Sequence, residues 1–351
     1  MPDLTILPLG LNFALFAGAA GIVWVAGTRI VDYADAIGER AGMGHALVGL
    51  ILLGGITSLP EIGVTVSAAS AGDANLAVNN LFGSIAMQVA ILAVIDFMIG
   101  RRALTMVVPE PAIMLLGALN ILLLTVACAG IVVGGGAILG IGAWAWGCLL
   151  GYVASVWLLS QTEGRQPWIA ADLDPDELKQ RSAAEAKADA DAEAISVYGL
   201  TARTAIAAAI ILGAGWAVSR TGSAIAEETG LGSSFVGFVL VAITTSLPEF
   251  STALAAARLG FFTMAISDIL GTNLINVGLL FVVDAVAGGE PALSRVGTFA
   301  VFGALLAIAV TSIFVIGLAE RRDRTFLRMG MDSIAVLVCY LGGVAILYTL
   351  R

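Results

Sequence analysis

The stretch TSLPE occurs at residues 57–61 and again, without a change, at residues 245–249, which is 188 positions further along the chain. The sequence around both copies keeps the same offset without a gap over more than fifty residues. Gly72, Gly83 and Asp96, for example, meet Gly260, Gly271 and Asp284. Self-similarity at a fixed offset indicates a duplicated structural unit. We therefore expect a fold of two related halves.

The composition places the chain in a membrane. Hydrophobic residues make up 59% of the 351 positions and charged residues 12%, against about 25% charged in soluble domains. Mean hydropathy is +0.98, which excludes an ordinary soluble enzyme. The net charge of −9 and the lack of a basic stripe exclude a nucleic-acid binder. Cys128, Cys148 and Cys339 lie in apolar runs and predict buried thiols, not disulfides.

Ten apolar segments are long enough to cross a bilayer, which takes about 20 residues each. The segment that starts the chain, residues 1–10, contains no Lys or Arg, so we expect a retained first helix and no cleaved signal peptide. The prediction is an all-α integral membrane protein. The ten predicted spans are 10–31, 45–70, 74–98, 109–130, 135–159, 201–221, 232–257, 262–287, 296–318 and 331–349.

One long polar stretch, residues 161–198, separates the halves and carries nine acids and four bases. It divides the chain into a first five-helix repeat (1–160), a linker (161–198) and a second five-helix repeat (199–351). Fourteen Lys and Arg residues fall on the side of this linker and three on the other side. Basic residues mark cytoplasmic loops, so we expect the linker in the cytoplasm, both termini outside, and insertion in the cytoplasmic (inner) membrane.

An odd number of spans in each repeat gives the two halves opposite orientations. The repeats are then inverted, an architecture that recurs in secondary transporters and places the substrate site at the middle of the bilayer, where broken helices meet.

Glu61 and Glu249 lie in the middle of apolar segments. An ionised side chain there costs at least about 2.5–3.5 kcal/mol, and such residues usually face a cavity or a cation. Each follows a proline, which cannot donate a helical hydrogen bond and bends the helix. Both helices two and seven are therefore predicted to be broken, with carbonyl groups released near Ile56, Thr57, Thr244 and Thr245. Carboxylate, hydroxyl and carbonyl oxygens are hard ligands that suit Ca²⁺ or Na⁺.

Helices three and eight each carry a polar stripe with a spacing of four residues, which places its members on one helix face. The two stripes are related by the same offset of 188 residues. Repetition favours a cation pathway over a simple contact between helices. The stripes are Asn80, Ser84 and Gln88 in the first half, and Asp268, Thr272 and Asn276 in the second.

The two TSLPE segments, together with Gly83-Ser84 and Gly271-Thr272-Asn273, resemble the alpha-repeats of sodium/calcium exchangers of the cation/calcium antiporter superfamily. The resemblance implies a ten-helix antiporter that exchanges Ca²⁺ for Na⁺ by alternating access and needs no organic cofactor. It assigns Ca²⁺ to Glu61, Glu249, Thr57 and Thr245. It also implies that helices one and six slide across the rest of the protein. The residues around the Na⁺ or proton positions would be Ser58, Ser246, Ser84, Thr272, Gln88 and Asn276.

The sequence departs from that family at several positions. Gln88 and Asp268 each stand where the family usually has Asn. Amides at 88 and 276 also resemble calcium/proton exchangers, so exchange of Ca²⁺ or another divalent cation for H⁺ stays open. A cation channel and a membrane hydrolase are less favoured, because inverted repeats supply a pocket and no nucleophile or HExxH motif is present. We expect Asp96 and Asp284, at helix ends, to be solvated at the membrane surface.

Overall fold

The computed structural model describes residues 7–41, 54–100, 103–106, 111–162, 197–258, 260–320, 325–326 and 328–351. Within these ranges eight helices are long and apolar enough to cross a membrane, and the bent pair Ser233–Thr245 with Leu247–Arg258 makes a ninth span. The predicted span 45–70 is described only from Gly54 onward, and most of the linker lies outside the described residues. The all-helical membrane fold is confirmed.

The same order of elements appears in both halves. In the first half the elements are α1 (Leu9–Ala41), α3 (Gly54–Thr57), α4 (Leu59–Ser70), α5 (Ala74–Ile99), α6 (Pro111–Val133), β1 (Ala137–Ile138), β2 (Ile141–Gly142) and α7 (Ala143–Thr162). In the second half they are α9 (Val197–Thr229), α10 (Ser233–Val236), η3 (Gly237–Val241), α11 (Ala242–Thr245), α12 (Leu247–Arg258), α13 (Phe262–Gly278), α14 (Leu280–Ala287), α15 (Ala292–Arg295), α16 (Thr298–Glu320), β3 (Thr325–Phe326), β4 (Met329–Gly330) and α17 (Met331–Leu350).

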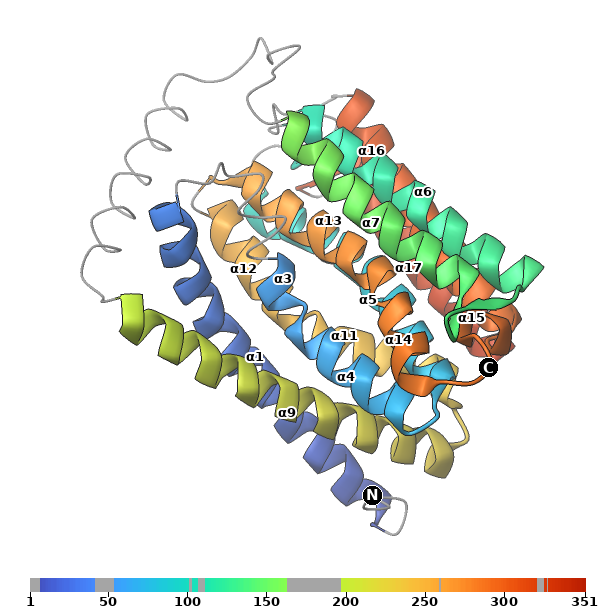
Figure 1. The fold of residues 1–351 in the computed structure, drawn as a ribbon. Coiled ribbons are helices and arrows are strands. Elements are labelled where there is room, and N and C mark those ends of the chain that lie inside the picture. Colours follow the sequence, from blue (N-terminus) through green and yellow to red (C-terminus); the bar gives the residue numbers. More distant parts are fainter. Residues whose placement is uncertain are drawn as a thin grey trace.

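The helices pack in layers, and each layer contains helices from both halves (Figure 1). On one side α1 and α9 cross each other. The short helices come next, with α4 against α9 and α12 against α1. Helices α5 and α13 form the next layer, and α6, α7, α16 and α17 form the opposite side. The contacts follow the repeat, because α5 packs on α16 as α13 packs on α6.

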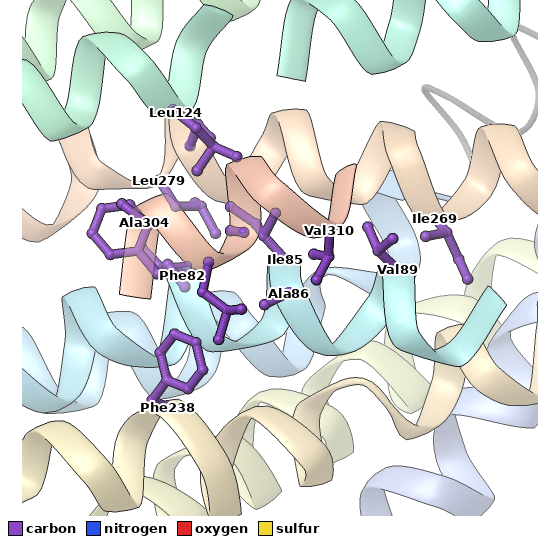
Figure 2. Close-up of a cluster of buried hydrophobic side chains, with 14 of the residues drawn as sticks. Phe82, Ile85, Ala86, Val89, Leu124, Phe238, Ile269, Leu279, Ala304 and Val310 are labelled. Atoms are coloured by element: carbon purple, nitrogen blue, oxygen red, sulfur yellow. The ribbon is translucent and has the colours of Figure 1, made fainter. Parts of the chain in front are cut away.

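The apolar core lies around α5. This helix and the pair α13–α14 are the most enclosed spans, with 72% of each span buried against 22% for α7. Figure 2 shows α5 side chains meeting residues of α6, η3, α13 and α16; the labelled residues are Phe82, Ile85, Ala86, Val89, Leu124, Phe238, Ile269, Leu279, Ala304 and Val310. Gly83 of α5 faces the backbone of Phe238 so closely that a Cβ would overlap it. The core helices therefore depend on a residue without a side chain at this crossing.

Two small hairpins that the sequence did not predict join the last two helices of each half. β1 pairs with β2 and β3 with β4, both antiparallel, and their residues are related by the repeat offset of 188. The predicted start of the fifth span at 135 is wrong, because α7 begins at Ala143. The reason lies in the glycines: Gly134, Gly135 and Gly140 adopt positive φ angles of 67°, 157° and 80°, which a helix does not allow.

These hairpins are held by Asp96 and Asp284, and each aspartate binds the hairpin of the other half. Asp96 accepts backbone N–H groups from Leu104 and from Gly330, both at 2.7 Å. Asp284 accepts those of Ala292 at 2.6 Å and Gly142 at 2.8 Å. The prediction that these acids are solvated is wrong: they are 1% and 5% exposed. Two charge-assisted hydrogen bonds each replace the lost water.

Replacing Asp96 or Asp284 by Ala should destabilise the protein, because two buried N–H donors lose their acceptor in each case. We expect a loss of about 2–4 kcal/mol per substitution, seen as a lower midpoint of thermal unfolding of the purified protein in detergent. Glu290→Gln, which changes an exposed acid, is the control and should leave the midpoint unchanged. An unchanged midpoint in both Asp variants would contradict the assigned role.

Gly83→Ala should disturb the crossing of α5 and η3, because the added methyl group meets the Phe238 backbone. Overpacking against backbone is expected to cost about 3 kcal/mol, measured as a fall in thermal midpoint and in the yield of monodisperse protein. Gly213→Ala in α9 is the matched control, since a Cβ there meets no atom within 4 Å. Equal behaviour of the two variants would refute the close approach.

Candidate functional site

Each TSLPE segment forms a break between two short helices. In the first half Ser58 separates α3 from α4. Its backbone still makes helical hydrogen bonds: Ser58 N–H donates to the Gly54 carbonyl (3.1 Å), and Ile62 N–H donates to the Ser58 carbonyl (2.9 Å). In the second half Ser246 occupies the same place between α11 and α12, which meet at 43°. The proline that follows donates no hydrogen bond to the preceding turn, which explains the break in both halves. Each glutamate thus lies in the first turn of a helix, the favoured end for a negative charge.

The threonine of each TSLPE segment pairs with the hydroxyl of the other half. Thr57 lies 3.3 Å from Thr272, Oγ1 to Oγ1. Thr245 Oγ1 lies 3.1 Å from Ser84 Oγ and 3.5 Å from the Oδ1 of Asn80. The two hydroxyl pairs are equivalent under the offset of 188 residues. They bring α3, α5, α11 and α13 to one place, so both polar stripes face both motifs.

The carboxyl groups lie within this cluster. Gln88 donates its Nε2 to Glu61 Oε1 at 3.4 Å. Glu249 interacts electrostatically with Glu61 and with Asp268, and the Thr57 hydroxyl lies beside both Glu249 and Asp268. Three acids therefore share one buried region, two contributed by the second half and one by the first.

All twelve predicted site residues are buried, with side chains no more than 1% exposed. Several of their polar atoms have no hydrogen-bond partner among the described residues, which is unusual for buried groups. These atoms are Glu61 Oε2, Glu249 Oε1 and Oε2, Asp268 Oδ1 and Oδ2, Asn80 Nδ2, Gln88 Oε1, Ser246 Oγ, and both amide atoms of Asn276. The cluster is an enclosed set of oxygen-rich ligands whose interaction capacity the described residues do not fill.

The carboxylates do not form a metal site without help. Among the described residues, no three side chains of the types His, Cys, Asp and Glu converge closely enough to hold a metal ion. A cation in this cluster would need hydroxyl, amide or carbonyl oxygens besides the acids, and the threonines and polar stripes supply them. Such a mixed set of neutral and charged oxygens is typical of hard cations.

The sequence of the chain matches the family described as "Sodium/calcium exchanger protein" over residues 11–161 and 200–349. The chain belongs to the sodium/calcium exchanger family. Members of this family are secondary transporters, so the protein is a membrane cation exchanger and not an enzyme. The match covers both halves and leaves out most of the acidic linker.

Individual relatives agree with this family. The chain is 37% identical to the sodium/calcium exchanger MaX1 of Methanosarcina acetivorans over 73 residues, which is only 21% of either chain. It is 26% identical to the inner membrane protein YrbG of Escherichia coli over 264 residues, 75% of either chain. The structure resembles that of the sodium-calcium exchanger NCX_Mj soaked with Na⁺ and Sr²⁺, with a TM-score of 0.61, 16% identity, and coverage of 96% of this chain and 99% of that one. This likeness confirms the fold of the exchanger family.

The two halves are not equivalent in the cluster. Gln88 reaches Glu61, whereas Asn276 at the equivalent position makes no side-chain hydrogen bond, because its side chain is one methylene shorter. Asp268 adds a charge where the first half has the neutral Asn80. Ser58 donates its hydroxyl to the Gly54 carbonyl at 2.6 Å, while Ser246 has no such bond. The second half therefore carries more of the unfilled ligand capacity.

Asn273 is a further candidate that was not among the predicted site residues. It lies in α13, is 0% exposed, and neither of its amide atoms has a hydrogen-bond partner. The spacing of four residues that defined the stripe excluded it, because Asn273 follows Thr272 directly. A buried amide inside an apolar helix was the available signal.

Asp268→Asn should raise the thermal midpoint of cation-free protein, because it removes a buried negative charge beside Glu249 whose oxygens accept no hydrogen bond of good geometry from the described residues. An increase equivalent to about 1–3 kcal/mol is expected, measured in detergent with a chelator present. Asp284→Asn is the matched control and should lower the midpoint, since this carboxylate accepts two backbone N–H groups. A fall in both variants would show that Asp268 has a stabilising partner.

Proposed function

We propose that the protein is an antiporter that exchanges Ca²⁺ for Na⁺ across the membrane, with Glu61 and Glu249 as the central ligands of both ions. Thr57 and Thr245 complete the Ca²⁺ site. Na⁺ ions would use the surrounding oxygens of Ser58, Ser246, Ser84, Thr272, Gln88 and Asn276, with Asn80 and Asp268 one turn away on the same stripes.

The observation that carries this proposal is the reciprocal pairing of Thr57 with Thr272 and of Thr245 with Ser84. Each pair joins a broken helix of one half to the polar stripe of the other. Because each half contributes to both pairs, residues 188 positions apart meet in one buried cluster. A site built equally from two inverted repeats is the arrangement expected near the middle of the bilayer.

Charge balance explains why such a site would couple two ions. Two ionised carboxylates neutralise one divalent cation, or two monovalent cations. With no cation present, two like charges would remain in a medium of low dielectric constant, at a cost of several kcal/mol. The empty protein therefore resists the change of access, and one ion must be replaced by the other before the site faces the opposite side.

The change of access would involve α1 and α9. These helices pack on each other and on the broken helices α4 and α12, and they lie outside the bundle formed by α5, α6, α13 and α16 (Figure 1). Sliding of this pair would uncover the cluster on one side at a time. The buried state of every proposed ligand then corresponds to an occluded conformation.

The orientation proposed from the basic residues places both termini outside and the linker in the cytoplasm, with the protein in the cytoplasmic membrane. The family match, which spans both halves and leaves out most of the linker, supports the division into two repeats, 1–160 and 199–351, with the linker 161–198 between them.

Exchange of Ca²⁺ for H⁺ is the alternative. It is favoured by the amides Gln88 and Asn276 at the centres of the two polar stripes. These neutral side chains do not titrate, so the protons would be carried by the two glutamates as a coupled pair.

The test is uptake of ⁴⁵Ca²⁺ into proteoliposomes loaded with Na⁺ at equal pH inside and outside. We expect uptake that requires internal Na⁺, and a loss of at least about 100-fold in Glu61→Gln and Glu249→Gln, because one carboxylate cannot balance a divalent ion. Glu290→Gln, at an exposed position, is the control and should transport normally.

Vesicles with no Na⁺ and an outward proton gradient distinguish the alternatives. Uptake driven only by this gradient, and abolished in the same two variants, would replace Na⁺ by H⁺ as the counter-ion. Absence of Ca²⁺ uptake under both gradients, with folded protein present in the vesicles, would overturn the assignment of Ca²⁺.

A further inference from the structure

An open apolar groove runs between α1 and α9 on the side of the protein away from the core. Its volume is about 720 Å³, within the range of about 300–1,000 Å³ that is usual for ligand sites. The residues that line it are Gly18, Gly21, Ile22, Val25, Ala26, Arg29, Arg203, Ile206, Ala207 and Ile210. Eight of these ten residues are apolar or glycine, and the two others are arginines.

Two glycines of α1, Gly18 and Gly21, line the groove at the end opposite Arg29 in the sequence. A Cβ built on Gly18 or Gly21 meets no atom within 4 Å, so the space beside α1 is open there. The walls are branched apolar side chains that α9 and α1 leave uncovered, with Val25 60% and Ile206 62% exposed. The groove therefore has the volume and the apolar surface for a flexible hydrocarbon chain.

The two arginines lie together at one end of the groove. Arg29 is on the carboxyl side of the α1 stretch and Arg203 on the amino side of the α9 stretch, and the two helices run in opposite directions past each other (Figure 1). Among the side chains that the structure describes, none of those lining the groove is acidic. This end of the groove carries two positive charges beside its apolar walls, a pattern that suits a phosphate group attached to a hydrocarbon chain.

The length of the groove fits one leaflet of a membrane. Gly18 and Arg29 are eleven residues apart in a helix, which corresponds to about 16 Å at about 1.5 Å per residue. The hydrocarbon core of a bilayer is about 30 Å thick, so one leaflet contributes about 15 Å. An acyl chain that starts at the arginines would end near Gly18, at the middle of the bilayer.

We propose that this groove binds one anionic phospholipid, with an acyl chain between α1 and α9 and its phosphate between Arg29 and Arg203. The count of basic residues assigns the arginine end to the cytoplasmic leaflet, where anionic headgroups attract Lys and Arg. The lipid fills the surface between two helices that contact each other and the broken helices. It thereby adds a lipid contact to the helix pair that packs on the broken helices α4 and α12.

The experiment uses the full-length protein in phosphatidylcholine nanodiscs that contain a small fraction of a phospholipid with a diazirine on its acyl chain. One sample carries the diazirine on phosphatidylglycerol and the other on phosphatidylcholine. After irradiation, labelled peptides are identified by mass spectrometry. We expect the phosphatidylglycerol probe to label residues 18–29 and 203–210, and to exceed the phosphatidylcholine probe there by about 30-fold, about fivefold for each arginine.

Two sets of variants separate the headgroup contact from the groove. Arg29→Gln with Arg203→Gln should reduce labelling by phosphatidylglycerol to that by phosphatidylcholine, and Arg29→Gln alone by about fivefold. Gly18→Leu with Gly21→Leu should fill the groove and reduce labelling by both probes. Arg295→Gln and Gly10→Leu are the controls, because neither residue lines the groove, and labelling should be unchanged.

Equal labelling by the two probes in the wild-type protein would overturn the proposal, and so would a preference for phosphatidylglycerol that persists in the double arginine variant. The labelling pattern does not depend on ion exchange, so its result stands apart from that of the transport assay.

Discussion

The free-energy cost of a carboxylate in an apolar medium determines much of this structure. Among the residues whose side chains the structure describes, five acids in the membrane-spanning segments are buried: Glu61, Asp96, Glu249, Asp268 and Asp284. They fall into two groups. Asp96 and Asp284 each accept two backbone N–H groups and join the halves. The other three keep oxygen atoms that no described residue satisfies. The hydrogen bonds thus separate two acids with backbone partners from three acids that, in the proposed function, would be stabilised by a transported cation.

Hydrogen bonds between the two repeats are a second constraint on the fold. The hydroxyl pairs at the centre and the aspartate bonds at the two ends all join one half to the other, and each has its equivalent at an offset of 188 residues. Neither half can satisfy its buried polar groups alone. The cluster itself is asymmetric, because the second half has Asp268 at the position where the first half has Asn80. Different charges at equivalent positions allow the two sides of one site to bind ions unequally.

Much of this could be predicted from the sequence. The composition and the long apolar segments predicted the membrane class. The identical TSLPE segments predicted two halves, and the spacing of four residues placed Ser84 and Thr272 on the helix faces that meet Thr245 and Thr57. What local patterns could not provide were the contacts between distant segments. Nothing near Asp96 reveals that its partner is the N–H of Gly330, since any backbone N–H could serve. The glycines at 134–136 could be read as a break but not as a hairpin, and the bend at Ser246 could be expected from Pro248 without its angle.

The aspartate bonds also have a consequence for how the protein is made. Gly142 lies 142 residues before its acceptor Asp284, and Asp96 lies 234 residues before its donor Gly330. During synthesis the first half therefore enters the membrane with a hairpin and a carboxylate whose partners have not yet been translated. The bond of Gly142 can close once Asp284 has been inserted, and the bond of Asp96 to Gly330 only near the end of the chain. A chain that stops before residue 284 therefore lacks the partner of each of these two groups, so the contacts that join the halves form late in synthesis.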